Sequence, residues 1–143
     1  MKKKFKISDH IRSRTKEWLR KADHELAYLK YSPFDIDDPP TDTACKMAHW
    51  VVEYSLKAVL IFNKMKVKVH GHDLISSLTE LIKIDSKFET LKDSCFQVSN
   101  YKVDFTYPLD APEVISVDEA KAAILYAEEI NDFVKEWLSE SGL

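Results

Sequence analysis

The stretch DTACKMAHWVVEYSLKAVLIFNKM, residues 42–65, contains neither glycine nor proline. Its apolar side chains recur at helical spacing over a wide face, and nearly every position between Ala58 and Phe62 is apolar. At 1.5 Å per residue, a helix of this length spans roughly 36 Å, about the width of a small domain. We therefore expect residues 42–65 to form a long central helix around which the remaining helices pack.

The composition is that of one helical domain. The chain has 143 residues, of which 45% are hydrophobic and 31% charged, so it is long enough to bury one substantial core. Only two glycines are present, which argues against a β-rich fold and excludes a glycine-rich phosphate loop. The net charge of −3 gives no general attraction to nucleic acid. We expect a single domain over residues 1–143, with residues 1–8 and 140–143 frayed.

No segment has the features of a membrane span or an export signal. No apolar run of about 18 residues occurs, and the basic N-terminus lacks the apolar core of a signal peptide, which predicts a cytoplasmic location. Cys45 and Cys95 lie within apolar helical patterns, which favours buried free thiols over a disulfide or a metal pair. Asp35 and Asp37 form an Asp-x-Asp pair, but a solvated acidic turn is the favoured interpretation. We expect no metal site and no cofactor.

Four further helical patterns lie outside the central one. The sequence predicts helices over about residues 8–31, 72–82, 86–98 and 116–139, the last beginning with the capping box SVDE. We therefore predict an all-α, up-and-down antiparallel bundle of four to five helices with a long central second helix. The predicted core includes the apolar residues Val51, Val52, Leu56, Val59, Leu78, Ile124 and Ala127.

Several motifs follow one another in an order typical of a known family. The first helix carries WLRKADHELAYL, and the central helix matches a pattern of roughly CFHAQQAAEKALKALL. A His-Asp-Leu follows at residues 72–74, and Tyr107 and Pro108 match the end of an Arg-Tyr-Pro. Over roughly residues 12–138 the chain resembles the HEPN domain family, small helical domains named for nucleotide binding in higher eukaryotes and prokaryotes. The resemblance implies a helical bundle.

The chain departs from this family where catalysis would lie. The two glutamines of the second-helix pattern are His49 and Trp50, and the arginine of Arg-Tyr-Pro is Thr106. Catalytic HEPN ribonucleases carry an arginine followed by a histidine after four to six residues. The three arginines of this chain all lie in the first helix, and only three residues separate Arg20 from His24. Metal-free RNA cleavage needs a base and a rigidly held cation, so the sequence leans against an enzyme.

Polar groups on and after the central helix are the candidate ligand contacts. Glu53 and Lys57 are spaced i, i+4, which suits an ion pair on the helix surface, in a groove or at a subunit interface. His72 and Asp73 either meet a ligand at the mouth of a groove or act as caps, with His72 bonded to a carbonyl of the preceding turn. The candidate groove residues are His49, Glu53, Lys57, His72, Asp73 and Tyr107.

A basic strip follows the central helix. Its lysines are candidate phosphate contacts or form a solvated face. Trp50, near the middle of the central helix, either stacks on a base or lies in the core. The candidate phosphate contacts are Lys64, Lys66 and Lys68.

The resemblance implies a function in binding and assembly. HEPN proteins of this size are often paired with a minimal nucleotidyltransferase in toxin–antitoxin or stress-related systems, so we expect a non-catalytic partner of such a protein that binds nucleotide or RNA phosphate. The alternatives are a metal-independent ribonuclease toxin with a degenerate Arg/His site and a small-molecule binder without a partner protein. We also expect a homodimer. Its interface is expected to use Trp50 and Tyr54, with Tyr101 or Tyr107.

Overall fold

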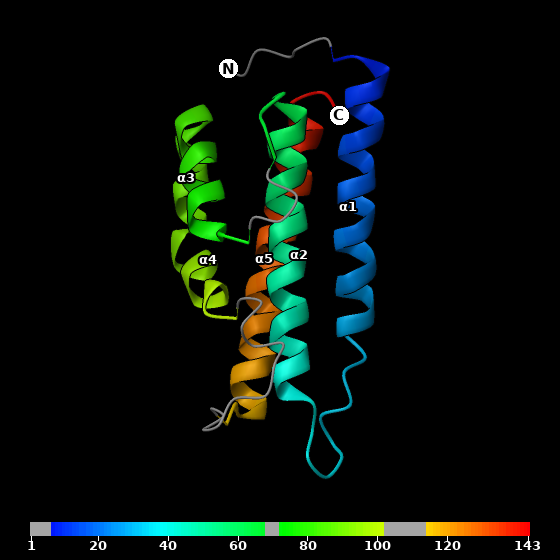
Figure 1. Cartoon of the computed structure of the whole chain (residues 1–143), viewed down its shortest axis with the longest axis vertical. Coiled ribbons are helices and arrows are strands. Elements are labelled where there is room, and N and C mark those ends of the chain that lie inside the picture. The colour runs from blue at the N-terminus through cyan, green and yellow to red at the C-terminus, as the bar shows by residue number, and fades with distance from the viewer. Residues whose placement is uncertain (1–6, 68–71, 102–113) are drawn as a thin grey trace.

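The computed structural model describes residues 7–67, 72–101 and 114–143, and these ranges contain helices and no strand (Figure 1). A 3-10 helix, η1 (Ser86–Leu91), leads directly into the fourth α-helix. The prediction of an all-α bundle is confirmed. The five α-helices are α1 (Asp9–Leu29), α2 (Thr41–Phe62), α3 (Leu74–Ile84), α4 (Lys92–Ser99) and α5 (Val117–Glu140).

Short polar side chains begin three of the five helices. Ser8 Oγ accepts a hydrogen bond from the backbone N–H of Ile11 at the start of α1. Asp73 and Ser116 accept in the same way at the starts of α3 and α5. Each bond satisfies a backbone donor that has no partner within its own helix, so the predicted helix starts at these positions are confirmed.

Helix α2 ends three residues earlier than the apolar pattern predicts. Lys64 takes the left-handed conformation, with φ of 60°, and the N–H of Met65 donates to the carbonyl of Leu60 at 2.9 Å. This bond closes the last turn in the manner of a Schellman cap. Asn63, whose side-chain amide donates to the carbonyl of Val59, supports the same turn. A polar Asn-Lys pair therefore stops the helix where periodicity alone continues it.

Helix α1 runs antiparallel to α5. Asp23 pairs with Lys135 at 3.2 Å, and Lys30 pairs with Glu128 at 3.4 Å, so positions further along α1 meet positions earlier on α5. α1 is also antiparallel to α2, and the loop of residues 30–40 connects the two helices (Figure 1). α1 thus covers one side of the α2–α5 pair.

Helices α2 and α5 run in the same direction. Asn131 Nδ2 donates to Ser55 Oγ at 3.1 Å, and the rings of Phe62 and Trp137 meet edge to face at 6.2 Å. The bundle is therefore not antiparallel at every neighbouring pair. The chain doubles back after α2, because α3 begins beside the middle of α2, and the α3–α4 pair then covers the side opposite α1 (Figure 1).

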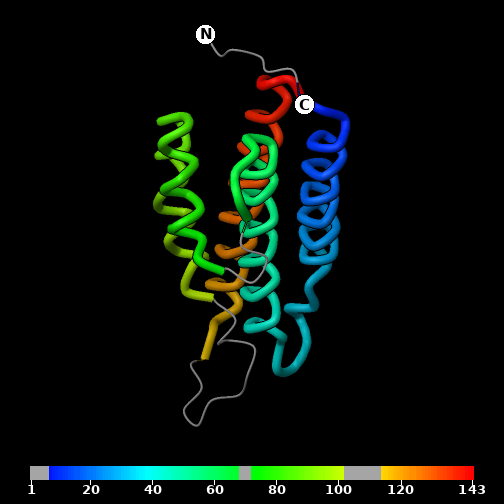
Figure 2. Tube along the Cα trace, turned by 45° about the horizontal axis from the view of Figure 1, so that its top comes forward, coloured from blue at the N-terminus to red at the C-terminus, as the bar shows by residue number. Residues whose placement is uncertain are grey.

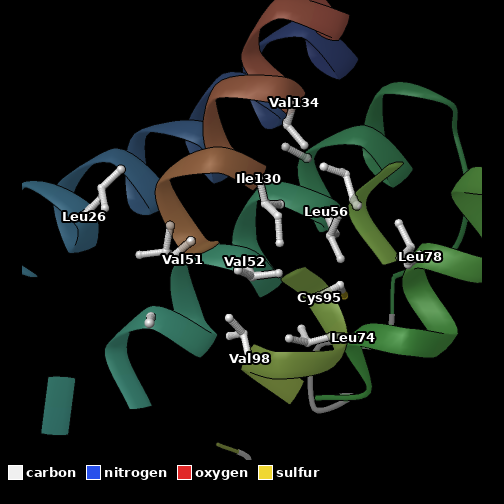
Figure 3. Close-up of a cluster of buried hydrophobic side chains, with 14 of the residues drawn as sticks. Leu26, Val51, Val52, Leu56, Leu74, Leu78, Cys95, Val98, Ile130 and Val134 are labelled. Carbon is white, nitrogen blue, oxygen red and sulfur yellow. The ribbon is translucent and has the colours of Figure 1, made fainter. Parts of the chain in front are cut away.

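One core joins these helices (Figure 3). Six of the seven predicted core residues are buried, whereas Ile124 is only partly buried and packs against the edge of the core. Figure 3 shows side chains from α1, α2, α3, α4 and α5 converging on one cluster. The labelled members are Leu26, Val51, Val52, Leu56, Leu74, Leu78, Cys95, Val98, Ile130 and Val134.

The start of α1 and the end of the chain lie together, as Figure 2 shows. The Arg12 guanidinium donates to the carbonyl oxygens of Gly142 and Leu143 at 3.3 and 2.9 Å. The expectation that residues 140–143 fray therefore differs from the structure, because Arg12 holds them against α1 and backbone hydrogen bonds, such as Leu143 N–H to the Leu138 carbonyl, hold them against α5. None of the helices in the described ranges is long and apolar enough to cross a membrane.

The two cysteines are buried and free, as predicted. Burial raises the pKa of each thiol to about 12, and a hydrogen bond with Tyr101 offsets part of this effect at Cys45. Tyr101 in turn donates to the Glu119 carboxylate, and burial and this bond raise the pKa of Tyr101. Glu119 thus ties the end of α4 to the start of α5.

Candidate ligand-binding site

A carboxylate in the middle of α2 organises a cluster of charged groups. Glu53 is 5% exposed, and its Oε2 accepts from the Nζ of Lys57 at 3.1 Å. Its Oε1 lies 2.7 Å from His72 Nδ1 and 3.9 Å from His49 Nδ1. Buried charges are stable only when paired and hydrogen bonded. Glu53 is therefore the shared partner of one lysine and two histidines.

Helical geometry and the returning chain both build this cluster. His49, Glu53 and Lys57 are spaced by four residues, which places them on one face of α2. His72 belongs to the segment before α3 and reaches Glu53, nine residues short of the end of α2. His72 is thus held by a carboxylate, which corrects the expectation that it bonds a carbonyl of the preceding turn.

Two members of the cluster, Glu53 and His72, line a pocket between α1 and α2. The pocket has a volume of about 460 Å³, within the range of small-molecule sites, about 300–1,000 Å³. Its wall combines three aromatic side chains with acidic, basic and imidazole groups. The lining residues are Glu17, Trp18 and Lys21 from α1, Trp50, Glu53 and Tyr54 from α2, and His72.

The aromatic rings of the pocket are held by each other and by lysines. Trp18 and Tyr54 meet across the two helices at a centroid distance of 5.8 Å and an interplanar angle of 55°. Lys57 Nζ lies 5.6 Å from the centre of the Trp18 ring, and Lys46 Nζ lies 5.4 Å from that of Trp50. Such cation–π contacts are attractive and favour these positions of the indole rings. Trp50 is half-buried, so it lines the pocket and is not a core residue.

Charge in the pocket is largely paired within the protein. A hydrogen bond from Arg20, reinforced by its charge, lowers the pKa of Glu17, so this carboxylate is ionised and matched by a neighbour. Burial, with the carboxylates of Glu25 and Glu53 nearby, raises the pKa of Tyr54, so its phenol stays protonated. Lys21 is exposed and lines the pocket. The pocket thus offers aromatic surface, one solvated ammonium group and the His72 imidazole.

The predicted groove residues that the structure describes fall into two groups. His49, Glu53, Lys57 and His72 come together in the cluster. Asp73 caps α3 through its bond to Ser76 N–H and also lines a second cavity of about 310 Å³.

Of the predicted phosphate-contact lysines, the two that the structure describes do not line the pocket. Lys64 is exposed at the end of α2, and Lys66 lines the second cavity. Lys68 and Tyr107 lie outside the described residues.

Tyr101, expected at a dimer interface, is only 8% exposed, which leaves little of its surface for a partner.

The α1 side of the pocket does not follow from the sequence motifs. Apolar periodicity places Trp18 on the core stripe of the first helix, and Glu17 and Lys21 are charged residues of its solvated side. Their spacing over residues 17–21 does predict that they lie on one turn of the helix. Only the packing of α1 on α2 shows that this turn faces Trp50 and Glu53.

No group of three or more His, Cys, Asp or Glu side chains that could hold a metal ion occurs among the described residues. None of the three arginines is among the residues that line the pocket with His72. Arg12 binds the C-terminal carbonyls, and Arg20 is bonded to Glu17. Asp35 and Asp37 are both exposed in the loop between α1 and α2.

Fold and pocket together define an all-helical domain with an aromatic and polar site between its first two helices. A family model described as HEPN domain matches residues 15–137, most of the chain. The chain therefore belongs to the HEPN domain family, as the motifs predict, and the family suggests a nucleotide- or RNA-related function. Comparisons with curated proteins and with solved structures give no significant match.

Proposed function

We propose that this chain is a HEPN binding module that holds a nucleotide in the α1–α2 pocket and does not cleave RNA by itself. The observation that carries the proposal is the pairing of Trp18, Trp50 and Tyr54 with Lys21 and His72 around one cavity of about 460 Å³. Aromatic rings stack on bases whatever their sequence, and a lysine meets phosphate as a point charge. The pocket thus has surfaces for both ends of a nucleotide.

The arrangement of the cations supports binding without cleavage. In-line attack on RNA needs a cation held rigidly beside an acid–base histidine, and arginine suits this role because its fork holds two phosphate oxygens. Arg20 uses Nε and Nη2 on Glu17, at 3.3 and 3.0 Å. Lys57 is buried against Glu53. The pocket cation is therefore the flexible Lys21, which can bind a phosphate without orienting it for attack.

One observation favours a second candidate, the degenerate ribonuclease. The Glu53 carboxylate lies 2.7 Å from His72 Nδ1, and a carboxylate in this position orients an imidazole as a general base. Incubation with total RNA and labelled oligonucleotides, beside His72→Ala, separates the two functions. We expect no cleavage by either protein. Cleavage by the wild type that disappears in His72→Ala would replace the binding module with the ribonuclease.

Partner proteins form part of the same proposal. HEPN proteins of this size are often paired with a minimal nucleotidyltransferase in toxin–antitoxin or stress-related systems, and the membership of this chain in the family supports such a partner. For a homodimer, Trp50 and Tyr54 offer half-buried aromatic surface. The two buried free thiols support a reducing compartment such as the cytoplasm. Co-expression with a nucleotidyltransferase encoded by a neighbouring gene, followed by affinity purification, tests the pairing. Recovery of the tagged chain without that protein would count against it.

Tryptophan fluorescence and calorimetry test the nucleotide site. Trp18 and Trp50 line the pocket, so bound nucleotide should quench their emission. Loss of one stacking ring costs about 1–3 kcal/mol, so Trp50→Ala should weaken binding by roughly 5- to 150-fold. Phe96→Ala removes an exposed ring on α4 and serves as the matched control. Equal affinities in the wild type and Trp50→Ala, or no binding of any nucleotide, would refute the site.

A further inference from the structure

Most of the charged side chains around His72 are paired with a charge of opposite sign. From α2, the Glu53 carboxylate is matched by the Lys57 ammonium, and His49 lies on the same carboxylate. From α1, Glu17 is matched by Arg20, and Lys21 lines the pocket. Next to His72, the Asp73 carboxylate is engaged at the start of α3 and does not line the pocket. The Glu25 carboxylate acts on Tyr54 but does not line the pocket. With neutral imidazoles, the charged groups that line the pocket and their ion-pair partners therefore leave one positive charge, on Lys21.

The hydrogen bond to Glu53 decides how His72 meets a ligand. Nδ1 lies 2.7 Å from Glu53 Oε1, so this nitrogen carries the proton and donates it to the carboxylate. The other nitrogen, Nε2, is an acceptor when the ring is neutral and a donor when it is protonated. The His72 side chain is 36% exposed and lines the pocket, so a ligand there can reach it.

We propose that the pocket is selective for a phosphate monoester, and that His72 takes up a proton at Nε2 when a nucleoside monophosphate binds. This inference rests on the proposed function and names its ligand class. A phosphodiester has one negative charge, which Lys21 alone matches. A phosphate monoester has nearly two negative charges at neutral pH, because its second pKa is about 6. Protonation of His72 supplies the second positive charge, and the imidazolium Nε2–H donates to a phosphate oxygen.

The proton balance has a measurable sign. Protonated His72 and the monoester dianion attract each other, so affinity for the monoester should rise as pH falls from 8.5 to about 6.5. Below about pH 6 the phosphate itself binds a proton and the gain should stop. Adenosine and cyclic AMP, a phosphodiester, should show little dependence over the same range. The ratio of affinities for AMP and cyclic AMP should therefore change by about tenfold between pH 8.5 and 6.5, the change expected for one charge-assisted hydrogen bond.

The test is calorimetry of the full chain with AMP, cyclic AMP and adenosine at pH 7.5, in two buffers with different heats of ionisation. The dependence of the measured heat on the buffer counts the protons taken up on binding. We expect net uptake of up to about half a proton for AMP, the most that a tenfold change in affinity allows, and none for the other two ligands. His72→Gln should abolish the uptake, whereas His10→Gln, which removes an exposed imidazole at the start of α1, should retain it.

Each outcome has a separate meaning. Binding of AMP and cyclic AMP with equal affinity and no uptake would overturn the monoester selectivity and leave the nucleotide site in place. Uptake that persists in a folded His72→Gln protein would move the proton to another group and overturn the role of His72. Absence of binding by all three ligands would refute both proposals. If His72→Gln does not fold, NMR titration of the wild-type imidazoles with and without AMP decides, because AMP must make one histidine harder to deprotonate.

Discussion

Replacing Glu53 with glutamine should destabilise the domain far more than the same change in an exposed ion pair. The substitution keeps the volume of the side chain, so it creates no cavity and changes mainly the charge. Lys57, only 3% exposed, would lose the carboxylate that lies 3.1 Å from its Nζ, and His72 would lose its anionic partner. Removing one member of a buried pair costs about 3–5 kcal/mol. Typical domains are stable by about 5–15 kcal/mol, so this loss is large.

Urea denaturation at pH 7.5, followed by circular dichroism, measures the free energy of unfolding. A loss of this size should lower the thermal midpoint by roughly 6–20 °C, since each kcal/mol corresponds to about 2–4 °C in a domain near this length. The matched control is Glu89→Gln, because Glu89 and Lys92 form an exposed pair at 3.6 Å. Exposed pairs contribute about 0–1 kcal/mol, so Glu89→Gln should change the free energy of unfolding very little.

A double-mutant cycle isolates the pairing itself. Lys57→Met removes the ammonium and leaves a similar apolar stem, so the double variant Glu53→Gln with Lys57→Met contains no unmatched charge from this pair. It should be more stable than Glu53→Gln alone, with a coupling energy of about 2 kcal/mol or more. If Glu53→Gln costs no more than Glu89→Gln, the cluster is solvated, and the charge balance argued for the pocket fails.

Three further predictions concern the core, the thiols and the assembly. Leu56→Ala should lower the free energy of unfolding by about 2–5 kcal/mol in urea denaturation, because Leu56 is fully buried. Leu125→Ala, on the exposed side of α5, should change it by no more than about 0.5 kcal/mol. Equal losses in the two variants would mean that Leu56 of α2 is not in the core. Cys45 and Cys95, with pKa values raised from 9.0 to about 12, should be neutral at pH 8 and react with an aromatic disulfide reagent only after unfolding; rapid reaction in the native protein would contradict their burial. Sedimentation at micromolar concentration should give twice the chain mass of 16.6 kDa if the proposed homodimer forms, and a 16.6 kDa species would refute it.

Much of the candidate site could be predicted within one helix. The i, i+4 spacing of His49, Glu53 and Lys57 places them on one face of α2 whatever surrounds the helix, and the Glu53–Lys57 ion pair follows from that spacing. The spacing does not show whether the face is wet or buried. From the sequence, Lys57 is compatible with an exposed position on the helix surface. In the structure it is buried, because α1 and the segment before α3 pack against this face of α2.

Contacts between segments far apart in the chain could not be predicted. Trp18 and Tyr54 are 36 positions apart, and each is an ordinary aromatic residue of its own amphipathic helix. Their meeting depends on the rotation of α1 against α2, which the side chains along the whole interface determine together. His72 is similar, because its motif indicates only the start of a helix and not that the chain returns to Glu53.

The sequence by itself determined that this protein is an all-helical HEPN domain. Apolar periodicity, the caps at Ser8 and Ser116 and the family motifs are local properties, and the free energies that favour helices act over a few residues. The tertiary structure alone decided where the chain turns back, which charges are buried and that α1 supplies one wall of the pocket. These features depend on excluding water between surfaces distant in the chain. Burial of this kind, which no single helix determines, places the imidazole of His72 between a carboxylate and the pocket.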